Sequence, residues 1–267
     1  MRPGPSWTFS GFQVVEHPGA RVLARPEAVP WVRFVLESGR SLHSAAGRDR
    51  GAFRLEGRYP VFVIAAKSPG EEEKATHRWA VRHYARGGRF VPILLGDRYL
   101  RFERIRPYHE IEASETARER GISTPRVVAA ALYPSRLFYR ADLVTQFVPD
   151  ASDLVESFFD TSRKGVGGAA ERLDSLRVTG DLIRRMAGAG LRHRDLHARN
   201  ILLEWRGSVP RPHLLDLDRC EIEPSGAPVS PTSMHQRLRR SLRKWERRTG
   251  IRISEREWAA LDQAVRG

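Results

Sequence analysis

Cysteine is nearly absent from this sequence of 267 residues, in which Cys220 is the single example. One cysteine cannot form a disulfide within the chain, and it cannot build a zinc site that depends on several thiolates. Cys220 lies shortly after Asp216, next to an apolar stretch. We therefore expect it to be a small residue of the core.

Long hydrophobic runs are also missing. No run reaches the length of a membrane-spanning helix, and residues 1–15 contain Pro3, Pro5 and polar residues where a secretory signal has an apolar stretch. We therefore expect a protein that stays in the cytoplasm. With 40% hydrophobic and 29% charged residues, the chain suits one globular, two-lobed domain with a core of its own.

Acidic residues are outnumbered, with 32 Asp and Glu against 46 Lys and Arg, and the formal net charge is +14. Only four of the basic residues are lysines. The excess predicts anionic partners, although coding bias and a solvated surface explain any single arginine equally well.

One basic stretch goes beyond that general excess. Seven of the twelve residues from 237 to 248 are basic, and Leu238, Leu242 and Trp245 recur at the spacing of a helix with one apolar face. The other face would be cationic and would suit anionic lipid or glycolipid headgroups. Nucleic acid would suit it too, but no recognisable nucleic-acid motif accompanies the charge.

Three polar residues in the second half have the spacing of a phosphoryl-transfer site. Asp195 and Asn200 lie five apart in the run that begins His193-Arg194-Asp195, and Asp216 follows after two apolar runs that a hairpin would join. Phosphoryl transfer needs a carboxylate to orient the attacking hydroxyl and oxygen ligands for Mg²⁺. The pattern predicts Asp195 as the catalytic base and Asn200 and Asp216 as metal ligands, as in the catalytic loop of protein-kinase-like enzymes.

Each of these residues also has a structural interpretation. Asp195 could cap a turn, Asn200 could bind backbone groups in a connector, and Asp216 could end a strand. Three coincidences of type and spacing would be needed together, so we favour the site. His193 and His197 flank Asp195, but two histidines without a helix or a third ligand do not indicate zinc. We expect them to hold backbone in place.

The first half is rich in strand-forming residues. Residues 61–65 and 79–84 favour a hairpin, and residues 108–120 suit a helix. Upstream, Gly47 and Gly51 bound a candidate phosphate loop, although two glycines equally indicate a plain turn.

Two residues could supply the positive charge that binds the nucleotide phosphates. Arg82 falls where a kinase strand carries its phosphate-binding lysine, while Lys67 also ends an apolar strand but is followed at once by a turn. We favour Arg82, whose guanidinium can bind phosphate oxygens as a planar fork. Glu110, in the first turns of the predicted helix, is the expected partner of Arg82, or else it complements the positive helix end.

The predicted strand 137–148 ends in a segment expected to join the two lobes. There Gln146 and Val148 would offer backbone groups to adenine, a kind of recognition that no side chain identity can prove. Residues 169–189 carry apolar residues at helical spacing and are read as core. Ser254 and Glu257 form a capping-box pattern that predicts a final helix.

Leu217 and Asp218 replace the Phe and Gly of the protein-kinase triplet, which points away from the protein kinases themselves. Four further patterns stand out, in residues 82–88, 97–100, 137–143 and 216–219. Together these segments resemble the 3-deoxy-D-manno-octulosonic acid (Kdo) kinase family of lipopolysaccharide kinases. The resemblance extends from about Gly47 to Trp245.

The resemblance implies an α+β, protein-kinase-like two-lobed fold with a strand-rich N-lobe and a helical C-lobe. Residues 1–34 are then an N-terminal extension, residues 35–148 the N-lobe, and residues 149–267 the C-lobe with basic C-terminal helices. It also implies an ATP- and Mg²⁺-dependent phosphotransferase for a sugar hydroxyl of the lipopolysaccharide inner core, in that family the Kdo 4-hydroxyl. Its acceptor, lipopolysaccharide or lipid A–Kdo, would be met peripherally at the anionic cytoplasmic face of the inner membrane.

Two alternatives stay open. A kinase for proteins or for small molecules such as aminoglycosides would share every ATP-site residue on the same fold. A non-catalytic pseudokinase scaffold would fit the arginine at position 82 and the short glycine loop, but the intact Asp195, Asn200 and Asp216 argue against it.

Overall fold

The computed structural model describes residues 9–55, 59–66, 77–85, 97–100, 105–159 and 168–267, and its contacts divide the chain into two compact units. Unit 1 comprises Met1–Glu112 and Arg126–Phe147, and unit 2 comprises Ala113–Pro125 and Val148–Gly267. Helix α4 (Arg106–Glu119) belongs to both, because its first half packs in the core of unit 1 and its second half in the core of unit 2.

Unit 1 is built on an antiparallel sheet with the strand order β1-β2-β7-β8-β5-β4-β3, and β6 also pairs with β8. The predicted hairpin is confirmed, because β4 and β5 pair with Phe62 opposite Val81. The strands are β1 (Gln13–His17), β2 (Ala20–Ala24), β3 (Phe53–Leu55), β4 (Val61–Ala65), β5 (Arg78–His83), β6 (Tyr99–Leu100), β7 (Val127–Ser135) and β8 (Phe138–Gln146).

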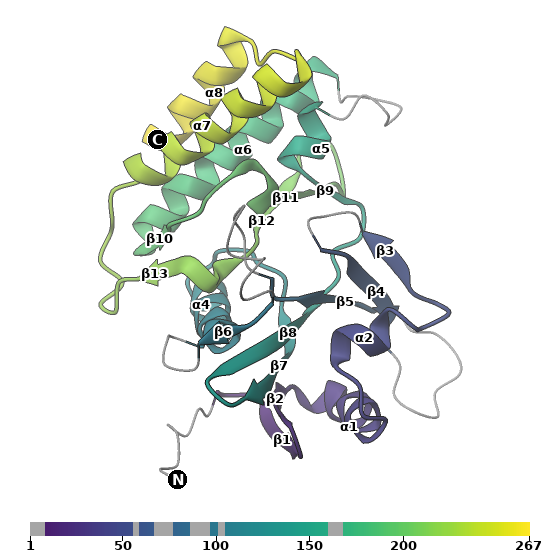
Figure 1. Cartoon of the computed structure of the whole chain (residues 1–267). Helices are drawn as coiled ribbons and strands as arrows, with labels where there is room; N and C mark the ends of the chain where they lie inside the picture. Colours follow the sequence, from purple (N-terminus) through teal and green to yellow (C-terminus); the bar gives the residue numbers. More distant parts are fainter. Residues whose placement is uncertain (1–8, 56–58, 67–76, 86–96, 101–104, 160–167) are drawn as a thin grey trace. The chain divides into compact units, whose positions relative to one another are not determined.

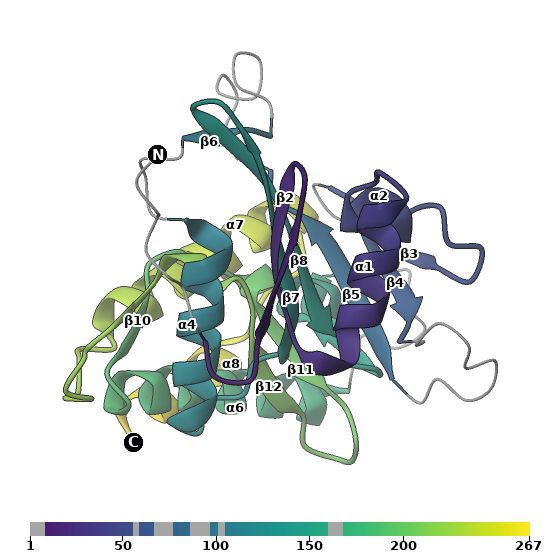
Figure 2. The same cartoon turned by 90° about the horizontal axis from the view of Figure 1, so that it is seen from below.

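Both faces of this sheet are covered. On one face lie α1 (Val29–Glu37) and α2 (Leu42–Ala46), as Figure 2 shows, and the first half of α4 packs on the other. Side chains alternate along a strand, so in β8 Val144 joins the core beside α1 and α2 while Leu143 joins the core beside α4. Burial on both sides explains why β7 begins as an unbroken apolar run.

The start of the chain departs from the sequence prediction. Residues 1–34 were expected to form an extension, but from residue 9 onward they supply β1, β2, the 3₁₀ turn η1 (Pro26–Ala28) and most of α1 to unit 1. Val22 of β2 pairs with Ala131 of β7 and is completely buried. Residues 113–125, expected in the N-lobe, group with unit 2 because the second half of α4 packs in the core of that unit.

Unit 2 is mainly helical, with two small antiparallel sheets ordered β12-β11-β9 and β10-β13. The mixed helix and strand content agrees with the predicted α+β class. The helices are α5 (Leu154–Phe159), α6 (Ala169–Gly188), α7 (Thr232–Thr249) and α8 (Glu255–Arg266), with 3₁₀ turns η2 (Ala198–Asn200) and η3 (Leu217–Arg219). The strands are β9 (Ala151–Asp153), β10 (Leu191–His193), β11 (Ile201–Glu204), β12 (Arg211–Leu214) and β13 (Cys220–Ile222).

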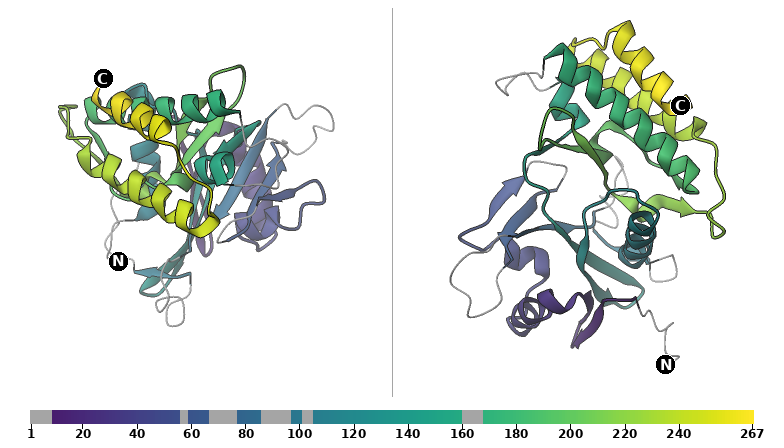
Figure 3. Two further views of the ribbon diagram at one scale, coloured as in Figure 1. Left: turned by 90° about the horizontal axis from the view of Figure 1, so that it is seen from above. Right: turned by 180° about the vertical axis from the view of Figure 1, so that it is seen from behind.

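Helices α6, α7 and α8 lie side by side, which Figures 1 and 3 show from opposite sides. The predicted capping box begins α8: the Ser254 hydroxyl accepts from the Glu257 N–H, and the Glu257 carboxylate accepts from the Ser254 N–H. Arg172 of α6 donates to that carboxylate at 2.6 Å, so one acidic residue both caps α8 and ties it to α6. Cys220 is completely buried, as expected, and burial raises its pKa to about 12.

Gly180 sets how closely α6 approaches α8. A Cβ at this position would lie 2.6 Å from the Leu261 carbonyl oxygen and 2.7 Å from Ala264 Cβ, whereas a Cβ at Gly188, in the same helix, would meet nothing within 4 Å. Alanine favours a helix over glycine by up to about 1 kcal/mol, but overpacking costs about 1–3 kcal/mol.

We therefore expect Gly180→Ala to lower the free energy of unfolding by about 1 kcal/mol or more in urea titrations. Gly188→Ala is the matched control and should leave it unchanged or raise it slightly. Equal effects of the two substitutions would contradict the proposed close contact.

Candidate active site

Two strand pairings in unit 2 bring the predicted catalytic residues together. β10 pairs with β13, placing His193 opposite Cys220, and β11 pairs with β12, placing Ile201 opposite Leu214. The catalytic loop, residues 194–200, leaves β10 and enters β11. Asp216 lies between β12 and β13, so the same two pairings carry it back beside the loop.

His193 links the two segments directly. Its Nδ1 accepts a hydrogen bond from the Asp195 N–H at 3.1 Å, and its Nε2 lies 3.1 Å from the Leu215 carbonyl oxygen. One ring nitrogen therefore accepts and the other donates, which requires the neutral imidazole. Burial lowers the pKa of His193 and favours the same neutral form. The predicted backbone role of His193 is confirmed.

Asn200 ties the loop together from its other end. Its Nδ2 donates to the Asp195 carbonyl oxygen at 3.0 Å, and its own carbonyl accepts from the Leu215 N–H at 2.9 Å. The amide is buried and is oriented through its nitrogen, so Oδ1 is the atom that can serve as a ligand. Asp195 keeps its side chain 48% exposed, with the Arg219 guanidinium 3.9 Å from its Oδ2.

Asp216 has a left-handed backbone conformation, with φ 59° and ψ 57°. This conformation costs a non-glycine residue about 1–2 kcal/mol, and such residues concentrate at functional sites. The residue before it is fixed by both His193 and Asn200. The fold thus holds a carboxylate in a costly conformation directly beside the catalytic loop.

Side chains far from the catalytic loop in sequence support it, and local sequence patterns did not predict these contacts. The Ala198 N–H donates to Ser241 Oγ of α7 at 3.1 Å. Arg199 pairs with the buried Asp153 at 3.2 Å and stacks over Trp245 of α7, with 5.2 Å between the guanidinium and the ring centroid. These partners lie more than forty residues away in sequence. Of these contacts, the sequence predicted only the helix α7, which carries Ser241 and Trp245.

In unit 1, Arg82 and Glu110 form the predicted ion pair. Arg82 projects from β5 toward α4, where its guanidinium donates to the buried Glu110 carboxylate. The Tyr84 hydroxyl donates to the same carboxylate, and the Arg82 guanidinium lies 4.6 Å from the Tyr84 ring centroid. The rival candidate, Lys67, lies outside the described residues.

Comparison with known proteins decides the family. The model of the lipopolysaccharide kinase (Kdo/WaaP) family matches residues 66–264. A 3-deoxy-D-manno-octulosonic acid kinase from Vibrio cholerae is 32% identical over 230 residues, covering 85% of this chain and 84% of the relative. The chain belongs to the lipopolysaccharide kinase (Kdo/WaaP) family.

Further relatives agree with this assignment. A 3-deoxy-D-manno-octulosonic acid kinase from Actinobacillus succinogenes is 34% identical over 185 residues, which is 68% of this chain and 72% of the relative. The solved structure of WaaP in complex with acyl carrier protein matches with a TM-score of 0.53 at 17% identity, covering 92% of this chain and 88% of that one. This likeness confirms the predicted protein-kinase-like fold.

The glycines of the expected phosphate loop have structural roles in this family member. Gly47 follows the last residue of α2, where a Cβ would lie 2.9 Å from the Phe62 ring. The Gly51 N–H donates to Asp49 Oδ1 at 2.7 Å in an exposed turn before β3. A helix end and a turn account for both residues, and phosphate contact by this loop stays a prediction.

The chain passes from unit 1 to unit 2 between Phe147 and Val148, inside the expected joining segment. The Gln146 N–H is bonded to the Arg126 carbonyl and the Phe147 N–H to the Arg78 carbonyl, both at 2.8 Å. Of its two backbone groups, Gln146 could therefore offer only the carbonyl to a ligand. The Val148 N–H has no hydrogen-bond partner among the described residues.

Three of the segments that carried the family resemblance meet in a partly buried cluster that the sequence did not predict. His83 lies between two carboxylates, with Nδ1 2.7 Å from Asp142 and Nε2 2.9 Å from Asp97. Asp142 is completely buried and also accepts from the Tyr133 hydroxyl and the His43 N–H at 2.9 Å. Burial alone would lower the pKa of His83, but the two carboxylates outweigh it and raise the pKa.

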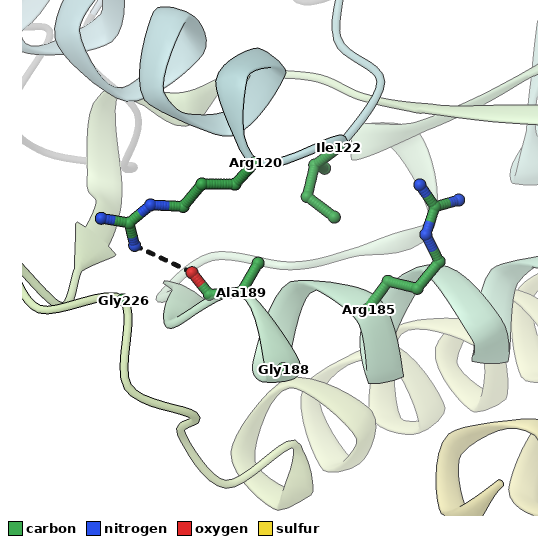
Figure 4. A pocket seen from close by; sticks show the side chains of 6 residues that line it. All are labelled: Arg120, Ile122, Arg185, Gly188, Ala189 and Gly226. Carbon is green, nitrogen blue, oxygen red and sulfur yellow. Dashed lines mark hydrogen bonds between the residues drawn. The ribbon is translucent and has the colours of Figure 1, made fainter.

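An open cavity of about 450 Å³ in unit 2 is lined by none of the predicted site residues. Figure 4 shows Arg120 and Arg185 on its walls. Arg120 donates to the Ala189 carbonyl at the end of α6, and Arg185 donates to the Gly121 carbonyl at the end of α4. The two arginines thus cap helix ends, a role that explains them without a ligand.

Among the described residues, no three or more His, Cys, Asp or Glu side chains gather where they could hold a metal ion. No helix in the described part of the chain is long and apolar enough to span a bilayer.

The raised pKa of His83 predicts how the stability of the kinase depends on pH. Because the folded pKa exceeds the unfolded value of about 6.5, the stabilisation by this ion-paired imidazolium is complete below pH 6.5 and is lost as the pH rises through the folded pKa. The difference in unfolding free energy between wild type and His83→Gln should therefore be larger at pH 6 than at pH 8 in urea titrations. His77→Gln, at an exposed histidine, is the control. A difference that does not change with pH would refute the charged form.

Proposed function

We propose that this chain is an ATP-dependent kinase for a sugar hydroxyl of the lipopolysaccharide inner core, the 4-hydroxyl of Kdo. One observation carries the proposal: in a member of the lipopolysaccharide kinase family, His193 and Asn200 each form hydrogen bonds to both Asp195 and Leu215, the residue preceding Asp216. Relatives that cover most of this chain are named Kdo kinases.

Asp195 acts as the base. Its carboxylate is partly exposed while its backbone is held at both N–H and carbonyl, so it can accept a hydrogen bond from an incoming hydroxyl without rearrangement. Asn200 Oδ1 and the Asp216 carboxylate would hold Mg²⁺, which commonly takes one or two protein oxygens and completes its shell with phosphates and water. Bound Mg²⁺ would neutralise charge that develops on the phosphoryl oxygens.

Nucleotide contacts come from the other predicted residues. Arg82, held by Glu110, would bind phosphate oxygens, and the Gly47–Gly51 loop stays a candidate for the same task. The carbonyl of Gln146 and the N–H of Val148 lie two residues apart, and in an extended chain such groups point the same way. That pair matches the adjacent donor and acceptor on the edge of adenine.

The acceptor accounts for the basic surroundings of Asp195. Kdo carries a carboxylate, and Arg219 lies beside the base with its side chain 54% exposed. A lipid A–Kdo acceptor is embedded in a membrane, so we propose that the protein works peripherally on the anionic cytoplasmic face of the inner membrane. The net charge of +14 favours association with such a surface.

Asp195→Asn tests the chemistry. The substitution removes the base but keeps the backbone hydrogen bonds, so phosphotransfer from radioactive γ-phosphate ATP should fall by about 10²–10⁴-fold with little change in nucleotide affinity. Lipid A–Kdo, a protein and an aminoglycoside serve as parallel acceptors. Asp181→Asn, at an exposed carboxylate of α6, is the control. Substantial activity of the Asp195 variant would overturn the base, and labelling of another acceptor alone would overturn the substrate.

Arg82→Met tests the phosphate grip. Loss of a charged hydrogen-bond donor should lower kcat/KM for ATP by roughly 10- to 100-fold, and Glu110→Gln should lower it less, because the arginine remains but loses its anchor. Arg33→Met removes an exposed charge on α1 and should change nothing. An unchanged kcat/KM in Arg82→Met would mean that another cation binds the nucleotide phosphates.

A further inference from the structure

Helix α7 carries a row of cations that its own packing does not use. Arg237, Arg240, Lys244 and Arg247 follow one another at spacings of three, four and three, which places them on one face over about 15 Å. All four are exposed, and none has an ion-pair partner in the part of the chain that the structure describes. We call these four residues the α7 stripe.

The neighbouring arginines of α7 are engaged in packing instead. Arg239 pairs with Asp262 of α8 and lies 4.6 Å from the Trp258 ring centroid. Arg248 lies 5.0 Å from the ring centroid of Trp245 in its own helix. Arg243 lies 5.9 Å from the Trp258 ring centroid. These contacts explain three of the seven basic residues from 237 to 248 and leave the four of the α7 stripe unexplained by folding.

A separate face of α7 holds the catalytic loop. Met234 Sδ accepts from the His193 N–H at 3.4 Å, Ser241 Oγ accepts from the Ala198 N–H at 3.1 Å, and Trp245 underlies Arg199. The helix therefore carries the loop that contains Asp195 and the α7 stripe on one rigid element. Whatever binds the stripe is set at a fixed position relative to the loop.

We propose that the α7 stripe docks the kinase on anionic lipid headgroups and so presents the catalytic loop to the membrane-embedded acceptor. This inference rests on the proposed function and names the surface that serves it. A straight row of four cations complements a flat, negatively charged surface. No large exposed apolar side chain of the described residues lies on α7, so the contact is electrostatic and does not insert into the bilayer.

The test compares the triple variant Arg240→Gln/Lys244→Gln/Arg247→Gln with Arg33→Gln/Arg40→Gln/Arg266→Gln, which removes the same charge from exposed positions elsewhere. Binding is measured by co-sedimentation with phosphatidylcholine vesicles, with and without phosphatidylglycerol, at low and high NaCl. Wild type and control should bind only the anionic vesicles, and less at high salt. The stripe variant should bind them on the order of 100-fold more weakly.

Activity measurements on two acceptors distinguish a loss of membrane docking from a loss of catalysis. The ratio of activity on vesicle-embedded lipid A–Kdo to activity on a deacylated, water-soluble acceptor should fall in the stripe variant and not in the control. Equal vesicle binding by the two variants, an unchanged activity ratio, or binding of wild type to a nucleic acid or an acidic protein but not to vesicles would overturn the docking role. If wild type phosphorylates neither acceptor, the proposed function fails, while the vesicle data still decide the lipid contact.

Discussion

The buried, neutral imidazole of His193 is the contact on which the catalytic half of the molecule depends. It accepts from the Asp195 N–H and donates to the Leu215 carbonyl, so it joins the loop that carries Asp195 to the segment that carries Asp216. Protonation would replace the acceptor nitrogen with a donor and break the first of these bonds. Burial prevents this by lowering the pKa, and the surrounding core therefore maintains the site electrostatically as well as sterically.

Charged residues are used in three different ways in this chain. Some are buried and paired to fix geometry, as with Glu110 beside Arg82 and Asp142 beside His83. Others cap helix ends or join helices, as Glu257 does. The α7 stripe does neither, since its cations stay in water. Because a surface cation without a partner contributes little to folding, the stripe is better explained by binding than by stability.

Much of the fold followed from local patterns. The hairpin of β4 and β5, the helix α4, the capping box of α8 and the amphipathic α7 were all predicted, because strand alternation, helical spacing and caps involve residues close in sequence. The N-terminal boundary was wrong. Residues near β2 do not show whether it pairs within the sheet or lies in a separate extension, because its partner β7 lies about a hundred residues further along the chain.

Residue type and short spacing were enough to predict the groups of the candidate site, namely Asp195 as base, Asn200 and Asp216 as oxygen ligands, and Arg82 with Glu110. The contacts that hold these groups depend on packing. Asp153, Ser241 and Trp245 support the catalytic loop from distant parts of the chain, and Asp142 and Asp97 converge on His83. Such pairings arise only when packing brings remote side chains together, so no periodicity in the sequence records them.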